Sequence, residues 1–210
     1  MKTRFTLTSL TLASLMMMGN AAMAAVVPSG TDAYFNVKLK LTGSCEVFTV
    51  ESGKSSAISA EDDATAGADI NFGTHIAKSG SEELSQGNVG QATNNIQVNC
   101  SKNTVFQVAL EPSNTNAEGT GSMSGLKGTN QDKIAYQLYK PTVSDSGDET
   151  ISNTISANKW GKGSNALTLT GKGLSTPIML PVFAKVPQDQ LSDKTPDTYQ
   201  DANADRKSVV

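Results

Sequence analysis

The feature that most constrains this sequence is a period of two in its short apolar runs. The clearest runs are residues 94–100, 104–110, 133–139 and 177–186, with a shorter one at 166–171. Alternate side chains of an extended chain point to opposite faces, so a period of two indicates a strand with one buried face. Residues 177–186 are almost continuously apolar, which is typical of a central strand covered on both faces. Together these runs predict an all-β sandwich or barrel.

Long polar segments separate the apolar runs. Residues 51–69 and 111–132 are rich in Gly, Ser, Thr, Asn and acidic residues. Such a composition cannot bury a core, so we expect loops there, or hairpins with decorated turns. The sequence shows no internal repeat and no interdomain linker, and its length suits a single domain behind an N-terminal leader.

The first 24 residues have the three parts of a secretory signal peptide. Lys2 and Arg4 precede an apolar run rich in Leu and Met, and Ala22-Met23-Ala24 offers a small-x-small cleavage site. A membrane anchor is the alternative, but the apolar run is too short for one and is interrupted by Ser and Thr. We therefore expect export of a mature chain spanning residues 25–210.

The charge of the mature chain is modest and acidic. Loss of Lys2 and Arg4 leaves 17 − 2 = 15 basic residues against 20 acidic ones, a formal charge of −5. Nucleic acids and anionic membrane surfaces are bound mainly through clusters of Lys and Arg, and the sequence has no basic block. Neither is expected as a partner.

Two cysteines, Cys45 and Cys100, remain after removal of the leader. An even number of cysteines in an exported chain predicts one disulfide, with a pair of free thiols as the alternative. A metal site is not expected, because the sequence has neither a Cys-x-x-Cys motif nor a cluster of Cys and His.

Catalytic chemistry has little support in the sequence. His75 is the only histidine, and it lies in a segment with apolar alternation, which favours a structural or exposed role. No serine lies in a Gly-x-Ser-x-Gly motif, and no phosphate-binding loop is present. The acidic groups Glu61-Asp62-Asp63 and Asp145/Asp148/Glu149 fall in loop-like composition and lack the spacing of a calcium loop. We expect no enzyme activity, no catalytic residues, no metal and no cofactor.

One alternating run lies near the start of the mature chain. Its apolar positions are Ala33, Phe35, Val37, Leu39 and Leu41. Lys38 and Lys40 fall on the opposite face of the same run. This run either forms the first strand of the domain itself, wholly or in part, or is a strand that completes another molecule.

Several stretches, taken together, resemble the spore coat protein U-type domain family, to which archaic chaperone–usher pilins of the Csu type belong. The matching stretches are FNVKLKLTGSCEV at 35–47, INFG at 70–73, NIQVNCSKNTVFQVAL at 95–110, DKIAYQLYK at 132–140, LSTPIMLPVFAKVP at 174–187 and PDTYQD at 196–201. They span nearly the whole mature chain.

The resemblance implies an incomplete immunoglobulin-like β-sandwich that lacks one strand and is completed by donor-strand addition. It divides the chain into a signal peptide (1–24), an N-terminal donor-strand extension (25–38) and a pilin domain (39–210). The five apolar residues of 33–41 would be the donor-strand anchors. The implied partners are neighbouring pilin subunits, a periplasmic chaperone and an outer-membrane usher. The implied product is a surface fibre for adhesion and biofilm formation.

The last ten residues depart from the pattern of that family. Members usually end in a long alternating apolar strand, whereas DANADRKSVV at 201–210 interrupts its alternation with Asp205, Arg206 and Lys207. We expect this polar ending to weaken assembly. The alternative function is a stand-alone secreted module that binds carbohydrate or another surface.

Overall fold

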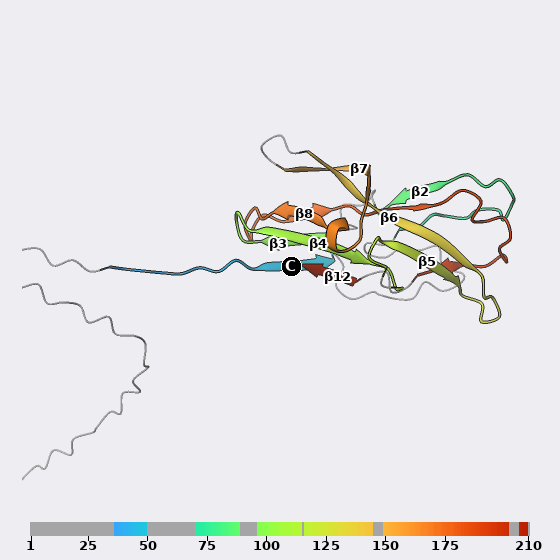
Figure 1. Ribbon diagram of the computed structural model, residues 1–210, viewed down its shortest axis with the longest axis horizontal. Coiled ribbons are helices and arrows are strands. Elements are labelled where there is room, and N and C mark those ends of the chain that lie inside the picture. The colour runs from blue at the N-terminus through green and yellow to red at the C-terminus, as the bar shows by residue number, and fades with distance from the viewer. Residues whose placement is uncertain are drawn as a thin grey trace, which may run out of the picture. The chain divides into compact units, whose positions relative to one another are not determined.

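The structure is a computed structural model that describes residues 36–49, 70–88, 96–114, 116–144, 149–201 and 206–209 (Figure 1). The chain separates into two units, Met1–Lys40 and Leu41–Val210. Of the first unit only residues 36–40 are described, so the predicted signal peptide and the anchors Ala33 and Phe35 lie outside the described residues.

The second unit is built of β-strands, as the alternation predicted. Its strands are β1 (Cys45–Thr49), β2 (Leu84–Gly87), β3 (Ile96–Cys100), β4 (Val105–Glu111), β5 (Thr120–Gly125), β6 (Lys133–Ser144), β7 (Thr150–Lys159), β8 (Leu167–Thr170), β9 (Ile178–Leu180), β10 (Phe183–Val186), β11 (Tyr199–Gln200) and β12 (Arg206–Val209). One 3-10 turn, η1 (Gly163–Asn165), precedes β8. The described part of the chain contains no helix that is long and apolar enough to cross a membrane.

The strands form three antiparallel sheets. Two have three strands each, in the orders β1-β3-β9 and β12-β4-β8. The third has the order β11-β5-β6-β10-β2, and β7 pairs with β6 outside that path. The polar segment 111–132 therefore holds a strand, β5, in a hairpin with β6. This pairing confirms the hairpin alternative for the segment. The strand is hard to recognise in the sequence because β5 is rich in Gly and Ser and its alternation is weak.

The apolar run 177–186 is divided between two sheets rather than forming one central strand. β9 pairs with β3, while β10 pairs with both β6 and β2. Pro181 and Val182 separate the two strands. Because proline has no backbone N–H to give to a ladder, the chain leaves one sheet at this point and enters the next.

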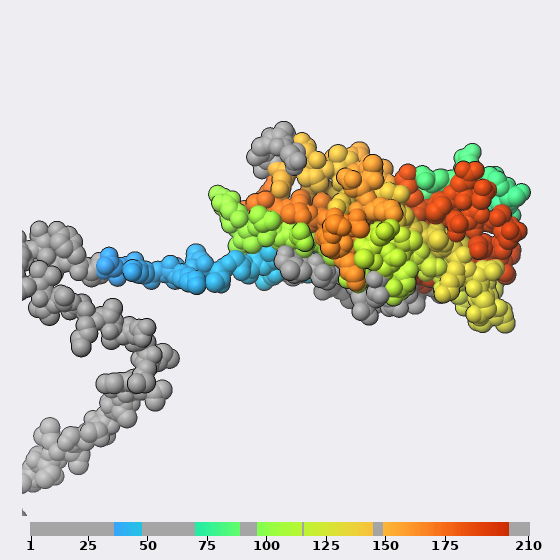
Figure 2. Space-filling model, viewed as in Figure 1, coloured from blue at the N-terminus to red at the C-terminus, as the bar shows by residue number. Residues whose placement is uncertain are grey.

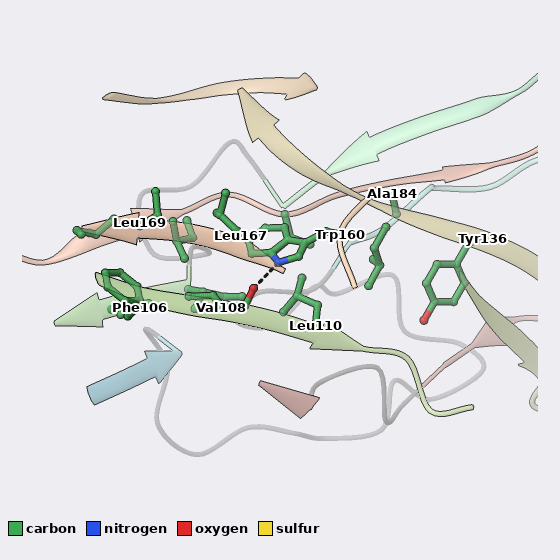
Figure 3. Packing of buried hydrophobic residues seen from close by; sticks show 14 of the residues in the cluster. Phe106, Val108, Leu110, Tyr136, Trp160, Leu167, Leu169 and Ala184 are labelled. Carbon is green, nitrogen blue, oxygen red and sulfur yellow. Dashed lines mark hydrogen bonds between the residues drawn. The ribbon is translucent and has the colours of Figure 1, made fainter. Parts of the chain in front are cut away.

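One hydrophobic core cluster draws its residues from strands of all three sheets. β3 buries every second residue, Ile96, Val98 and Cys100, and β4 contributes Phe106, Val108 and Leu110 to the same cluster. Figure 3 shows the three β4 side chains packed with those of Leu167 and Leu169 from β8, which belong to the same cluster. The chain is thus an all-β sandwich, as expected from the sequence.

Trp160 is completely buried in this core. Its Nε1 donates a hydrogen bond to the backbone oxygen of Val108 over 2.9 Å, drawn as the dashed line in Figure 3. The backbone at Trp160 packs so closely that a Cβ on Gly119 would meet its carbonyl oxygen at 1.8 Å, and Gly119 also has a φ of +78°. Glycine is needed at that position because it alone has neither the Cβ nor the penalty for positive φ.

Candidate assembly edge

Two edge strands of different sheets lie next to each other in the second unit. β1 ends one three-stranded sheet and β12 ends the other, and neither has a second ladder partner among the described residues. Cα atoms of the two strands come within 8 Å of each other (Figure 1). A free strand edge presents backbone N–H and C=O groups that can pair with another strand. We call β1 and β12 together the open edge.

β1 is fixed firmly to the sheet on its other side. It pairs with β3 along its whole length, and a disulfide joins Cys45 to Cys100, which face each other in the register with Cα atoms 4.1 Å apart. The next residues, Ser44 and Ser101, are joined by a backbone hydrogen bond of 2.9 Å. Cys45 and Cys100 therefore form a non-hydrogen-bonded pair, in which the two strands approach most closely. The predicted disulfide is confirmed.

Among the described strands, β12 pairs with β4 alone. Arg206 pairs with Glu111, Lys207 with Leu110 and Val209 with Val108. The polar ending thus forms a strand of four residues, and its register places Lys207 opposite Leu110, a core residue of β4. Whether this strand supports assembly remains a prediction.

The outer edge of β8, at the other side of the same sheet, is capped at its last residue, Thr170. The N–H of Gly171 bonds across to the oxygen of Thr104, so the N–H of Thr170 faces away from β4. There the carboxylate of Glu149 accepts hydrogen bonds from the Thr170 N–H (2.8 Å) and hydroxyl (3.2 Å). A charged side chain on an edge discourages pairing with another chain. This role for Glu149 was missed in the sequence, where it reads as a solvated loop acid.

The described part of the alternating N-terminal run is extended and belongs to no strand. Val37 and Leu39 are 85% and 83% exposed, and Leu41, the first residue of the second unit, is 83% exposed. Lys38 and Lys40 are exposed as well. The first strand of the domain begins only at Cys45. The roles of Val37, Leu39 and Leu41 as donor-strand anchors, like those of Ala33 and Phe35, therefore remain predictions.

The described residues that were considered for chemistry, His75 and Glu149, form no common site. His75 is exposed, and its Nε2 lies 2.7 Å from the backbone oxygen of Phe72. Within the described ranges no three His, Cys, Asp or Glu residues gather in an arrangement that could hold a metal ion. The acidic group 61–63, together with Asp145 and Asp148, lies outside those ranges.

The segment PDTYQD, which reads as a simple turn in the sequence, makes several side-chain hydrogen bonds to residues far away in the sequence. Asp197 accepts hydrogen bonds from Asn130 and from the backbone N–H of Lys127, while Asp201 accepts one from Tyr136. The hydrogen bond from Asn130 is the main cause that lowers the pKa of Asp197. Sequence patterns could not reveal these contacts, because the partners are more than sixty residues apart.

Among solved structures, the chain is similar to a complex of a chaperone with a tip adhesion subunit, CsuC–CsuE, from the archaic chaperone–usher Csu pili of Acinetobacter baumannii. The identity is 16% and the TM-score 0.35, and the match covers 81% of this chain but only 39% of the length of that one. No curated protein sequence matches the chain.

A family model gives the decisive comparison. The model of the spore coat protein U domain matches residues 31–203, which include the described part of the alternating run, both cysteines and the PDTYQD segment. By this match, the chain belongs to the spore coat protein U domain family.

Proposed function

We propose that the chain is a subunit of a surface pilus and polymerises by donor-strand exchange. Residues 33–41 of one subunit would pair with the open edge of the next. The observation that carries this proposal is the juxtaposition of two strand edges that have no partner among the described strands. The described part of the alternating apolar run, residues 36–41, is exposed and belongs to no strand. Membership of the spore coat protein U domain family makes the chain a structural subunit rather than an enzyme.

The open edge has the topology that an added strand requires. A strand between β1 and β12 would join the two three-stranded sheets into one sheet of seven strands, 3 + 1 + 3. Strand addition of this kind gains affinity from backbone hydrogen bonds and specificity from alternate side chains. Neighbours on both sides of a strand are about 9.6 Å apart, twice the usual strand spacing. Because β1 and β12 approach within 8 Å, they must part to admit the strand.

The alternating run supplies a suitable donor. Phe35, Val37, Leu39 and Leu41 are large apolar residues on one face. Full burial of four such side chains gives on the order of 6–12 kcal/mol before the cost of ordering the segment. The lysines at 38 and 40 would stay on the outer face, where charge discourages further edge pairing.

The remaining partners and the location follow from the same proposal. A free open edge is an aggregation hazard, so a periplasmic chaperone would cover this edge. At an outer-membrane usher, a donor strand would then replace the chaperone. The assembled fibre would serve adhesion and biofilm formation at the cell surface. A stand-alone secreted binding module is the competing function, and it requires no transfer of residues 33–41 between molecules.

The test is electrophoresis of material sheared from the cell surface, in SDS with and without boiling. Donor-strand fibres are held together kinetically and should give a ladder that collapses to one band on boiling. Val37→Asp with Leu39→Asp should abolish the ladder because charges would enter the acceptor. Lys38→Ser with Lys40→Ser, on the opposite face of the same run, should leave it. A monomer under both conditions in the unmodified chain would instead favour the stand-alone module.

A further inference from the structure

The chain that leads into β12 is attached to the β5–β6 hairpin at every second residue. Asp197 Oδ2 accepts hydrogen bonds from Asn130 Nδ2 (2.8 Å) and from the backbone N–H of Lys127 (3.0 Å). The Tyr199 hydroxyl accepts one from Asn130 Nδ2 (3.1 Å). Figure 2 shows the residues that lead up to 201, in red, next to the yellow β5–β6 hairpin at one end of the domain.

The third attachment, at Asp201, is the most buried. The hydroxyl of Tyr136 donates to Asp201 Oδ2 over 2.8 Å, and Tyr136 is only 5% exposed. Burial, and then the charge of Asp201, raise the pKa of the Tyr136 hydroxyl, so it keeps its proton. A hydrogen bond from a hydroxyl to a carboxylate is shorter and stronger than one between neutral groups.

Gly121 makes room for this bond. It faces Tyr136 across the β5–β6 ladder, and a Cβ at residue 121 would lie 2.1 Å from the ring. The ring therefore crosses β5 over the glycine and reaches Asp201 in the chain beyond β11. Glycine inside a strand weakens that strand, and it often marks a place where another group approaches closely.

Asp201 limits where β12 can lie. Five residue steps separate Asp201 from Arg206, which allows a reach of at most about 17–18 Å even for a fully extended chain. β12 has four residues and one ladder partner among the described strands. Such a short strand with a single neighbour has few bonds of its own to fix its register, so its position depends on the fixed point before it.

We propose that Tyr136, Asp197 and Asp201 form a positioning clamp for β12, the C-terminal half of the open edge. The inference rests on the proposed function. It means that residues remote from the donor strand decide whether a subunit can accept a strand. These residues do not affect the ability of the subunit to donate its own strand. The clamp residues are positioning residues and do not contact the donor strand themselves.

The experiment is a complementation assay with purified full-length mature chains. The clamp variants are Tyr136→Phe and Asp201→Ala, and the donor-defective variant is Val37→Asp with Leu39→Asp. Lys159→Gln is the matched control, since it removes a hydrogen bond of equal length (2.8 Å to Glu118) that has no connection to β12. Thermal unfolding followed by the fluorescence of Trp160 shows that each variant is folded at the assay temperature.

Each clamp variant alone should form at least tenfold less SDS-resistant polymer than the unmodified chain. Mixed with the donor-defective variant, it should give a heterodimer and nothing longer, because one chain only donates and the other only accepts. Hydrogen exchange of the amides in β12 should rise at least tenfold, while that of β3 is unchanged. Asp201→Asn keeps an oxygen for the tyrosine hydroxyl and should restore the ladder, and Lys159→Gln should never lose it.

Two results would overturn the clamp while leaving strand donation intact. One is a clamp variant that polymerises like the unmodified chain. The other is a folded clamp variant that fails to donate to the donor-defective chain. The proposed function fails separately if the donor-defective variant still polymerises by itself, or if the unmodified chain never does, and the clamp would then have no assembly to control.

Discussion

The Cys45–Cys100 disulfide should contribute about 4 kcal/mol to the free energy of unfolding. It closes a loop of 55 residues. For that length the chain-entropy relation gives a loss of roughly 14 cal/mol/K in the entropy of the unfolded chain, which is roughly 4 kcal/mol at 25 °C. Cys45→Ala with Cys100→Ala should therefore lower the melting temperature by about 8–16 °C, at about 2–4 °C per kcal/mol for a domain of this size. β1 should loosen first, because β3 is its only ladder partner among the described strands.

Urea unfolding followed by Trp160 fluorescence would measure this effect. Trp160 is the only tryptophan of the sequence and is completely buried, so its emission reports the core directly. The unmodified chain with its disulfide reduced is the control, and it should match the double variant to within about 1 kcal/mol, the cost of a small cavity at the buried Cys100. A stability loss below about 1 kcal/mol in both samples would refute the loop-closure reasoning.

Three further predictions concern β5, the chain before β12, and β12 itself. Gly121→Ala should destabilise the domain by about 1–3 kcal/mol, because the new methyl group displaces the ring of Tyr136, whereas Gly128→Ala meets nothing within 4 Å and should be neutral in the same unfolding experiment. The pKa of Asp197 is lowered in the folded chain, mainly by the hydrogen bond from Asn130, so its stabilisation is present above the unfolded value near 4 and lost as the pH falls below it. Asp197→Asn should flatten the fall in melting temperature between about pH 4 and 2, and an unchanged profile would contradict this. Replacing residues 206–209 with an alternating Val/Thr strand should raise periplasmic yield and surface polymer, and an unchanged yield on immunoblots would count against the idea that the polar ending limits assembly.

The alternating runs predict most of the strands of the fold. The runs at 94–100 and 104–110 form β3 and β4 with the expected faces buried. Alternation predicts this well because the apolar residues of a strand lie on the face that is buried. β5 is harder to find in the sequence, since Gly and Ser dominate it and its partner β6 supplies most of the apolar surface. Pro181 divides a run that reads as one strand, and sequence alone does not show that the two halves enter different sheets.

The sequence by itself determined that the chain is all-β, carries a disulfide and belongs to the resembled family, because each of these depends on local pattern or on residue type. Only the tertiary structure decided which strand edges are left unpaired. β1 and β12 are about 160 residues apart in sequence, and their approach depends on how every strand between them is paired. The same holds for Tyr136, Gly121 and Asp201: a hydrogen bond across a third strand leaves no periodicity in the sequence, since it depends on where three separate segments meet in space.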